Sequence, residues 1–452
     1  MTSLATPGIG SGLDVSGIVD KLVAIEQAPV DLLTKAKTTL QAKLSSFGLL
    51  KSYTTNLHDA GARLAAPTLW QQTAALTTDS SAVSASSTAS AQAGTYSVQV
   101  SQLAQAQSLA SGVYASSTAS VGTGTLKIEL GSYGAGNAFT GQTPPQSVDI
   151  VIGAGEDSLE SVRAKINAAN AGVTASIVKD ASGARLAIRS TATGVTSAIR
   201  ISATADTALP TLPTDPPSLA SLAYDPGNPA VSQLTQTVEA KNAQATINGL
   251  AVTSTTNTFT DAIEGVSLNV AKVTTAPVQI QVGPSNDAFK KAITDFVKAY
   301  NDINTYLTSQ TKYDPDTKVA ATLQGDGATL SLQRQLRAAI TLPSGASTTF
   351  QTLSDLGIQV QSGGGLLVND AKLTTALGNL SEVSKAFTNA GSGTSGDPSI
   401  GFAVRLEALT KALNNTDGAV STRTAALRDS IKRNDDDVAA LQARIAATKA
   451  RL

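Results

Sequence analysis

The stretch Leu33–Leu64 reads LTKAKTTLQAKLSSFGLLKSYTTNLHDAGARL and carries a heptad pattern. Positions that alternate by three and four residues are mostly apolar, which is typical of a helix that packs along one seam against another helix. The seam positions are Leu33, Ala36, Leu40, Lys43, Phe47, Leu50, Thr54, Leu57, Gly61 and Leu64. Pro29 precedes the stretch at a position that suits a helix first turn or a kink, and Pro67 closes it. We therefore predict a long helix near the N-terminus.

A second heptad seam lies at the opposite end of the chain. Its two columns are Leu413, Val420, Leu427, Asn434, Leu441 and Thr448, and Thr424, Ile431, Val438, Ile445 and Leu452. Asn434 stands in the seam, where a buried amide fixes the register at a cost in stability. Two seams at opposite ends predict an antiparallel pair of terminal helices with the rest of the chain inserted between them. Leu452 lies in mid-heptad without a capping Gly or Asn, so we expect the helix to continue beyond it.

The predicted contacts of this helix pair are made by ten seam residues. They are Leu40, Phe47, Leu50, Leu57, Leu427, Ile431, Asn434, Val438, Leu441 and Ile445.

The middle of the chain has the pattern of two β-rich regions. Alternation of apolar and polar residues predicts a first set of strands at 96–100, 126–130, 148–152, 173–178, 185–189 and 199–202, with a helix at 158–171. A Pro-rich passage at 210–229 is predicted to be irregular. The second set of strands is predicted at 243–247, 250–254, 266–273 and 278–282. Asn248-Gly249 predicts a tight hairpin within the second set.

Helical patterns resume after the second β region. We predict a helix at 287–311 with Asn286 as its N-cap, a helix at 328–340 opened by Asp326, and a helix at 371–377 capped by Asn369 or Asp370. A hairpin is predicted from 357–360 and 366–368. The fold class is therefore α+β and multidomain, with long terminal helices forming an antiparallel coiled-coil-like leg and two β-rich head domains inserted between them.

The predicted domains are nested. They are a terminal leg segment at 1–30, a helical stalk domain at 31–76 with 284–452, an inner β head domain at 77–113 with 236–283, and an outer β head domain at 114–235.

The composition excludes several kinds of site. The 452 residues include no Cys and a single His, which excludes disulfides, thiolate nucleophiles, Cys-bound zinc and His-pair metal sites within one chain. A net charge of −1 gives no basic field for nucleic acid and no polybasic patch for a membrane. The N-terminus lacks the basic and apolar regions of a cleaved secretory signal. We expect no cofactor, no nucleic-acid partner and no membrane partner.

The remaining candidates for chemistry have simpler interpretations. His58 neighbours Leu57 on the predicted helix, so packing is favoured over a general-base role. The run GIGSG at 8–12 follows no strand, so a hinge is favoured over a phosphate loop. Asp435–Asp437 are consecutive on a helix and point in different directions, so they do not converge on a cation. Paired carboxylates for glycoside hydrolysis stay open, because their spacing depends on the fold. We predict that the protein is not an enzyme.

Several runs, in order along nearly the whole chain, carry a resemblance to a known family. They are Gly8-Ile9-Gly10-Ser11-Gly12-Leu13-Asp14-Val15 with Ala28-Pro29-Val30, Gly94-Thr95-Tyr96-Ser97-Val98 through Leu103-Ala104-Gln105-Ala106, Ile247-Asn248-Gly249 with Asn257 and Ala262-Ile263-Glu264-Gly265-Val266, Leu323-Gln324-Gly325-Asp326, and Leu353-Ser354-Asp355-Leu356-Gly357-Ile358. Together they resemble the flagellar filament-capping protein family, also called hook-associated protein 2. Residues 149–189 are similar to a repeat shared by several flagellar axial proteins, including junction and hook proteins.

The resemblance implies a structural cap at the distal tip of the flagellar filament. It implies a homo-oligomeric ring, commonly a pentamer, that retains exported flagellin and promotes its folding and insertion. The implied partners are flagellin, the hook–filament junction protein and an export chaperone at the C-terminal helix. The implied location is extracellular, after export by the flagellar type III system. Two other classes stay open, a hook–filament junction protein and a secreted surface adhesin or enzyme.

An apolar stripe near the N-terminus is the candidate surface for a partner. It comprises Ile9, Leu13, Val15, Ile18 and Leu22, and no other segment of the chain is an evident partner for it. We expect these residues to contact flagellin or a neighbouring subunit, with packing on a continued C-terminal helix as the alternative.

Overall fold

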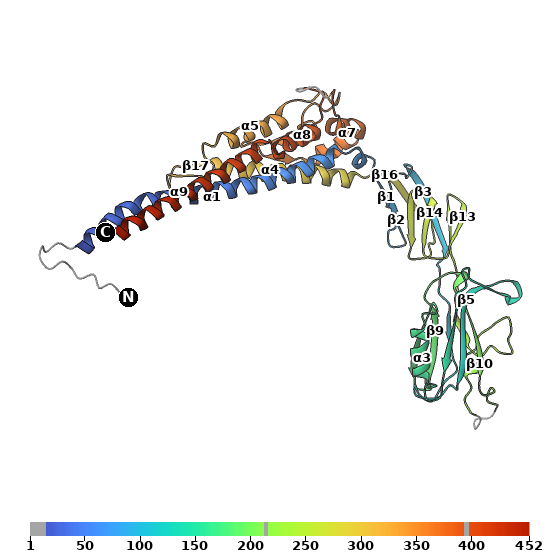
Figure 1. Cartoon of the computed structure of the whole chain (residues 1–452). Helices are drawn as coiled ribbons and strands as arrows, with labels where there is room; N and C mark the ends of the chain where they lie inside the picture. The colour runs from blue at the N-terminus through green and yellow to red at the C-terminus, as the bar shows by residue number, and fades with distance from the viewer. Residues whose placement is uncertain (1–14, 212–215, 393–396, 452) are drawn as a thin grey trace. The chain divides into compact units, whose positions relative to one another are not determined.

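The computed structural model describes residues 15–211, 216–392 and 397–451 of the chain. The contacts divide the chain into two compact units, one of residues Met1–Gln72 with Ser285–Leu452 and the other of Thr73–Pro284. We call them the helical unit and the β unit (Figure 1). The α+β class and the paired terminal helices confirm the predicted fold class.

The helical unit is built around a long first helix. Its elements are α1 (Val15–Ala65), α2 (Pro67–Trp70), α4 (Asn286–Thr311), β17 (Tyr313–Asp314), β18 (Val319–Ala320), α5 (Gly327–Thr341), β19 (Ile358–Val360), β20 (Leu366–Val368), α6 (Asp370–Leu377), α7 (Leu380–Thr388), α8 (Phe402–Asn414) and α9 (Ala419–Arg451). The helix α1 runs through Pro29 without interruption, so a first turn at Pro29 is wrong. Pro29 and Ile25, whose carbonyl loses its intrahelical donor, are both exposed, so water can bind that carbonyl. Packing of α1 against α9 offsets the cost of the proline.

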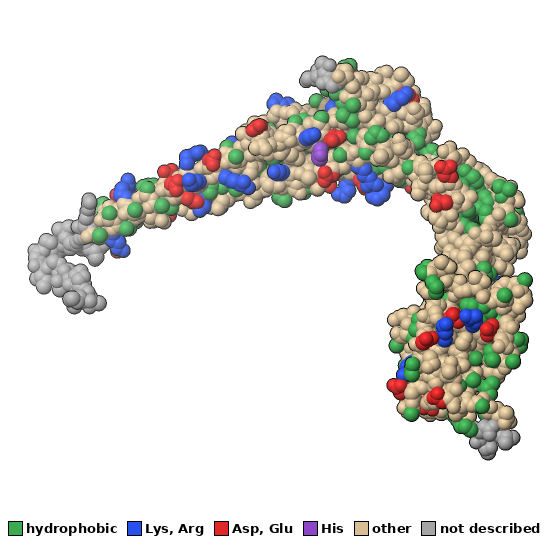
Figure 2. All heavy atoms as spheres, turned by 45° about the vertical axis from the view of Figure 1, so that its right-hand side comes forward, with side chains coloured by type: hydrophobic (Ala, Val, Ile, Leu, Met, Phe, Trp, Pro, Cys, Tyr) green, Lys and Arg blue, Asp and Glu red, His purple; other side chains and the backbone are tan. Residues whose placement is uncertain are grey.

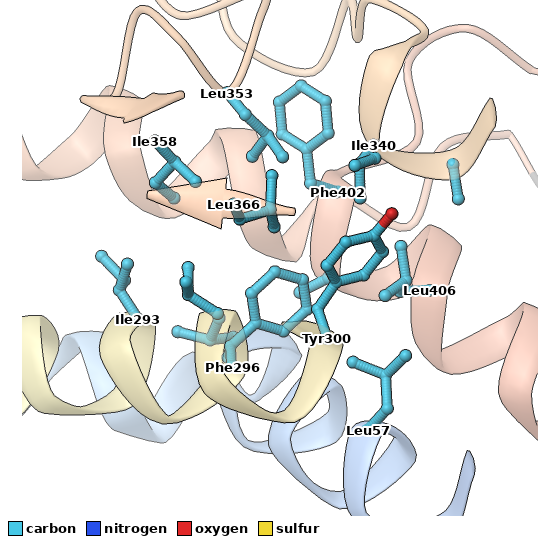
Figure 3. Close-up of a cluster of buried hydrophobic side chains, with 14 of the residues drawn as sticks. Leu57, Ile293, Phe296, Tyr300, Ile340, Leu353, Ile358, Leu366, Phe402 and Leu406 are labelled. Carbon is cyan, nitrogen blue, oxygen red and sulfur yellow. The ribbon is translucent and has the colours of Figure 1, made fainter. Parts of the chain in front are cut away.

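Large apolar side chains from α1, α4, α5 and α8 meet in one core (Figure 3). Phe296 and Tyr300 of α4 lie at its centre, with Leu57 of α1 on one side and Phe402 and Leu406 of α8 near by. All five are almost fully buried. At about 25 cal/mol per Å² of buried apolar area, such side chains dominate the stability of the unit.

Two helix boundaries differ from the prediction. The C-terminal seam was predicted as one helix, but Leu413 lies in the last turn of α8, and α9 begins after the turn at Asn415–Gly418. A side chain at Gly418 would collide with the carbonyl oxygen of Leu413, so glycine permits this tight turn. The N-cap of α4 is Ser285, and Asn286 already belongs to the helix. The predicted caps Asp326 and Asn369 are confirmed, because their side chains accept hydrogen bonds from Thr329 and Lys372.

The described residues of the β unit form four antiparallel sheets. Its elements are β1 (Thr73–Thr77), β2 (Val83–Ser87), β3 (Gly94–Gln102), β4 (Ser108–Ala110), β5 (Gly124–Tyr133), β6 (Phe139–Gly141), β7 (Ser147–Ile152), α3 (Leu159–Ala168), β8 (Val173–Asp180), β9 (Gly183–Ser190), β10 (Ala198–Ala205), β11 (Thr235–Val238), β12 (Ala243–Ile247), β13 (Leu250–Ser254), β14 (Thr258–Ile263), β15 (Val266–Val270) and β16 (Val278–Pro284). The sheet orders are β1-β16-β3-β12-β13, β14-β15-β2, β11-β4-β9-β8, and β10-β5-β6 with β7 paired to β5.

Two apolar cores hold these sheets together. One lies between the first two sheets and includes Val98, Val100 and Ile280, and the other lies beneath α3 and includes Leu126 and Ile166. The predicted hairpin at Asn248-Gly249 joins β12 to β13, with Ile247 paired to Leu250. The strand β14 was not predicted, because its exposed Asp261 adopts a positive φ and interrupts the alternation.

The two units differ in their surfaces. On the face drawn in Figure 2, charged side chains of both signs are frequent along the helical unit and sparse over the β unit. Hydroxyl and amide groups therefore provide much of the polar surface of the β unit, as the low content of charged residues predicts.

Candidate assembly interface on the leg

The free ends of α1 and α9 run antiparallel, and we call this pair, residues 15–44 and 427–451, the leg (Figure 1). Two ion pairs set its register. Lys37 Nζ lies 2.6 Å from Asp435 Oδ1, and Arg444 Nε lies 3.4 Å from Glu26 Oε2. Exposed pairs of this kind contribute only about 0–1 kcal/mol, so they mark the alignment more than they stabilise it.

The structure divides the predicted seam residues between two environments. Five seam residues are half-buried along the leg, namely Leu40, Ile431, Val438, Leu441 and Ile445. Leu427 is buried at the end of the leg that joins the core of the helical unit. Phe47, Leu50 and Leu57 are buried instead in the core of the helical unit, where α1 packs against α4 and α8. The leg is therefore a shallow two-helix seam that continues from a deep core.

Asn434 interrupts the apolar seam. Its side chain is 7% exposed, and its Oδ1 has no hydrogen-bond partner among the described residues. A buried amide oxygen without a donor costs about 1–3 kcal/mol. A polar residue in an apolar seam thus lowers stability and influences which register the two helices adopt. Asn434 adjoins Asp435, so the polar position coincides with the ion pair to Lys37.

The candidate partner-binding residues are placed only in part. Ile9 and Leu13 lie outside the described residues, and only the backbone of Val15 is described, at the start of α1. Ile18 and Leu22 are on α1, and their relative solvent accessibilities are 44% and 45%. They do not face α9, so an apolar surface is left open on the leg.

The open surface extends further than the sequence analysis predicted. Ile25 and Leu32 are 69% and 67% exposed and continue the spacing of Ile18 and Leu22. Leu32 was missed because the helix was expected to begin or bend at Pro29. The signal that could have found it is the seven-residue interval from Ile18 to Ile25 and from Ile25 to Leu32.

A buried carboxylate attaches the base of α9 to α5. Asp326 Oδ2 accepts hydrogen bonds from Arg423 at 2.8 and 3.1 Å, and its Oδ1 caps α5 through Thr329. Burial raises the pKa of Asp326, but the hydrogen bonds from Thr329 and the Arg423 guanidinium outweigh burial and hold that pKa below its usual value. The capping role was predicted, whereas the pair with Arg423 was not visible in the sequence.

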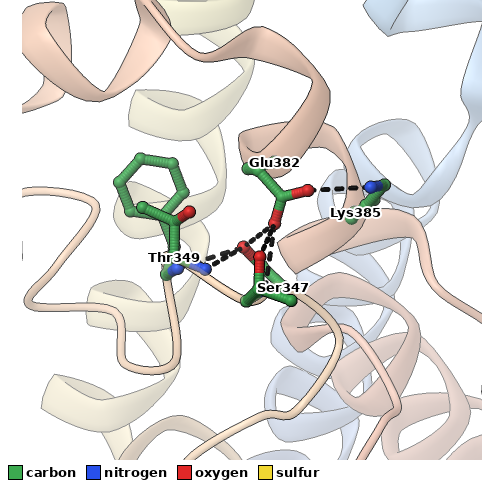
Figure 4. A network of polar contacts seen from close by, with 6 residues as sticks. Ser347, Thr349, Glu382 and Lys385 are labelled. Atoms are coloured by element: carbon green, nitrogen blue, oxygen red, sulfur yellow. Dashed lines mark hydrogen bonds and ion pairs between the residues drawn. The ribbon is translucent and has the colours of Figure 1, made fainter.

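A second carboxylate joins α7 to the loop between α5 and β19 (Figure 4). Glu382 accepts hydrogen bonds from Lys385 Nζ at 2.7 Å, Ser347 Oγ at 2.7 Å and the Thr348 backbone N–H at 2.9 Å. The bond from Lys385, followed by those from Ser347 and Thr348, lowers the pKa of Glu382 to about 2.

Other side chains considered in the sequence pack locally. His58 lies on α1, with its Nδ1 3.4 Å from Thr410 Oγ1 of α8. Within the described ranges, no group of three or more His, Cys, Asp or Glu side chains is arranged to hold a metal ion. No helix in the described part of the chain is long and apolar enough to span a membrane.

Family models match most of the chain. The model described as the flagellar hook-associated protein 2 N-terminus matches residues 11–107, the model of the C-terminus of the same protein matches 240–452, and the flagellin hook IN motif matches 134–192. The last match covers β6 to β9 and α3, the region of the predicted axial repeat.

Individual relatives agree with these matches. The flagellar hook-associated protein 2 of Escherichia coli strain K12 is 31% identical over 386 residues, covering 83% of this chain and 78% of the relative. The A-type protein of Pseudomonas aeruginosa is 30% identical over 463 residues, covering 98% and 91%. A crystal structure of the Escherichia coli flagellar cap protein FliD, domains D1-D2-D3, has a TM-score of 0.60 at 28% identity and covers 85% of this chain and 99% of that chain. The chain belongs to the flagellar hook-associated protein 2 family, which confirms the resemblance found in the sequence.

Proposed function

We propose that this protein is the structural cap at the distal tip of the bacterial flagellar filament. It retains exported flagellin and promotes its folding and insertion at the growing end, and so it is required for filament growth and motility. Family membership supports this role, since a similar solved structure, from Escherichia coli, is that of a flagellar cap protein. The observation that carries it in this chain is an open apolar stripe on a long two-helix leg.

The mechanism that we propose is steric and interfacial, without catalysis. Identical copies form a ring, five by resemblance to the family, and the two β head domains, inner and outer, form the plate under which flagellin folds. The legs contact flagellin and neighbouring copies through Ile9, Leu13, Val15, Ile18 and Leu22. Further proposed partners are the junction protein and an export chaperone at the C-terminal helix. The absence of Cys is compatible with a chain threaded unfolded through the type III exporter to the cell exterior.

The test is a strain that lacks the gene. Electron microscopy of the cells and an assay of flagellin in the medium should show bare hooks and shed monomer, and purified protein added back should restore growth at the tips. Filaments of normal length in that strain would contradict the cap. Loss of attachment to surfaces with normal motility would favour the adhesin alternative, and a location between hook and filament would favour the junction protein.

A double variant tests the leg stripe within this function. Leu13→Asp with Ile18→Asp should abolish filament growth while the β unit stays folded, because charge on an apolar contact surface prevents desolvation. The matched control is Ala24→Asp with Thr38→Asp, which places the same charges on another exposed part of α1. Normal filaments from the stripe variant, judged by electron microscopy, would exclude the stripe from assembly.

A further inference from the structure

The strand β13 leaves one of its two edges without a neighbouring strand. It pairs with β12 on one side and ends the five-stranded sheet of the β unit (Figure 1). Asn248, in the turn between β12 and β13, donates its N–H to Ser97 of β3 at 2.9 Å, so the even-numbered residues of this end of β12 face β3. The odd-numbered residues of β12 then bond to the even-numbered residues of β13. The N–H and C=O groups of Ala251 and Thr253 therefore point outward from the sheet.

These outward groups are open to a partner. Ala251 and Thr253 are both exposed. In the part of the chain that the structure describes, no strand pairs with this edge, and no hydrogen bond satisfies these backbone groups. The edge thus presents two donors and two acceptors to solvent.

A hollow separates the edge from the next strand, β14. Its volume is about 300 Å³, and it is lined by residues 252–254 and 259–262. Ser254 Oγ donates to the carbonyl oxygen of Thr258 at 2.7 Å and closes the hollow where the two strands are joined. The half-buried Val252 and the buried Phe259 contribute apolar surface to it. The hollow is therefore bounded by a free backbone edge, two apolar side chains and several hydroxyl groups.

The two sides of the hollow differ in how they are protected. On β14, Asp261 has a φ of +57°, and the pairing with β15 shifts register between Thr260 and Ile263. A bulge and a charged side chain both hinder the addition of a further strand. On β7 of the same unit, Lys165 Nζ covers the carbonyl oxygen of Val151 at 2.9 Å. The strand β13 has no proline, charged residue or bulge, so its edge is accessible.

The free groups identify the chemistry of the partner. Ala251 and Thr253 are two positions apart, so their N–H and C=O groups repeat at the spacing of an extended polypeptide. A strand added to such an edge binds through main-chain hydrogen bonds, which do not depend on sequence. Every second side chain of that strand faces the same side as Val252, where Phe259 favours an apolar residue. The carboxylate of Asp261 disfavours an acidic residue there.

We propose that the free edge of β13 binds an extended stretch of flagellin, before flagellin folds, as an additional strand of the five-stranded sheet. An unfolded chain has free backbone donors and acceptors along its whole length, whereas those of a folded protein are largely satisfied internally. This inference rests on the proposed cap function, in which flagellin arrives unfolded beside the β head domains. It assigns the first contact to the inner β head domain.

Hydrogen–deuterium exchange measured by mass spectrometry tests the site without a substitution. The full-length protein is measured alone, with a urea-matched blank, and with flagellin of the same bacterium that has been unfolded in urea and diluted. Exchange in residues 250–254 should slow roughly tenfold with flagellin, because the N–H groups of Ala251 and Thr253 become hydrogen-bonded. Residues 243–247 of β12 are the internal control, since that strand already has a neighbour on each side.

Two substitutions at one position separate the backbone from the side chain. Thr253→Pro removes the outward N–H without removing a bond to β12, and edge strands tolerate proline. It should weaken binding of fluorescently labelled, unfolded flagellin roughly tenfold, measured by anisotropy. Thr253→Val keeps the N–H and the branched shape, so it should bind as the original chain does. Calorimetry shows whether the β unit of each variant is folded.

The remaining outcomes contradict the proposal in different ways. Unchanged exchange at 250–254 in the presence of flagellin, with or without association of the two proteins, would refute the site. Slower exchange that depends on the concentration of this protein alone would assign the edge to a second copy. Normal filaments from a Thr253→Pro strain would refute a role of the edge in growth and leave the cap function standing. Normal filaments from the strain that lacks the gene would refute the cap function itself.

Discussion

The helical unit and the β unit of this chain are held together by different means. The six bulkiest fully buried side chains all lie in the helical unit, namely Tyr300, Phe47, Phe289, Phe296, Phe387 and Phe402. The cores of the β unit rely on Val, Ile, Leu and Ala. Each described core has one buried aromatic ring, Phe259 or Tyr224, with the partly buried Tyr96, Tyr114 and Tyr133 packed at their margins. The comparison teaches that a chain with few aromatic residues can concentrate its largest buried rings in one unit. The fold of the other unit is then specified by contacts that involve the backbone.

Backbone-specific contacts define the β unit. Gly124 has a φ of +138°, and a Cβ there would lie 2.3 Å from the carbonyl oxygen of Thr204, so no other residue fits. The amides of Asn167 and Asn257 each bond both the N–H and the C=O of one residue, Ala175 and Ala104, as a neighbouring strand would. The helical unit uses the same arrangement once more, between Asn301 and Leu366.

The largest expected effect comes from emptying the aromatic core. Phe296→Ala should lower the free energy of unfolding of the helical unit by about 3–5 kcal/mol, through lost burial and the cavity left behind. Trp70 is the single tryptophan, and it stacks on Phe289 and Phe387, so its fluorescence reports this unit in thermal unfolding. The control Leu367→Ala, at a side chain 55% exposed, should change little. An equal shift in the unfolding of the β unit would show that the two units unfold together.

The asparagine contacts allow a matched comparison between the units. Asn257→Ala and Asn301→Ala should each cost about 1–3 kcal/mol, because each leaves a backbone N–H and C=O without their partner. In calorimetry, Asn257→Ala should lower only the unfolding temperature of the β unit, which Trp70 fluorescence does not report. Asn301→Ala should lower only the unfolding temperature of the helical unit, which contains Trp70. Asn269→Ala, an exposed amide on β15, is the control. A small loss at Asn257 alone would mean that the β unit depends less on such contacts than the helical unit.

Long periodic segments were predictable from the sequence, and contacts between distant segments were not. The pattern of α4 gave its core face at Phe289, Phe296 and Tyr300, because each turn repeats the same local signal. Short strands such as β1 and β14 were missed, since their half-exposed positions depend on which strand pairs with them. The asparagine contacts also stayed hidden, because Asn257 and Ala104 are 153 residues apart in the chain.

In the candidate interface too, the periodic segments were predictable and the contacts between distant segments were not. The half-buried seam of α9 followed the heptad spacing of Val438, Leu441 and Ile445. The open stripe was predicted only as far as Leu22. Leu32 was missed because Pro29 was expected to begin or bend the helix, and tertiary packing against α9 overrides that local preference. The ion pairs that align α1 with α9, such as Lys37–Asp435, join residues near opposite ends of the chain, so no local pattern in the sequence predicts them.

The smallest expected effect concerns acid and again separates the two units. Among the described residues, the carboxyls with the most depressed pKa values, Glu382 and Asp397, both lie in the helical unit. A pKa of Glu382 lowered from 4.5 to about 2 means that its contribution to stability is present above pH 4.5 and is lost as the pH falls toward 2. Acid should therefore destabilise the helical unit over this range.

Glu382→Gln sharpens this expectation. The variant should be less stable than the original chain at pH 7 and should lose less stability between pH 4.5 and about 2, so the two curves converge in acid. Urea unfolding followed by Trp70 fluorescence at a series of pH values measures both curves. Asp59→Asn, at an exposed carboxyl on α1, is the matched control for replacing a carboxyl by an amide. Parallel curves for Glu382→Gln and the original chain would show that the bonds from Lys385, Ser347 and Thr348 do not favour the charged carboxylate.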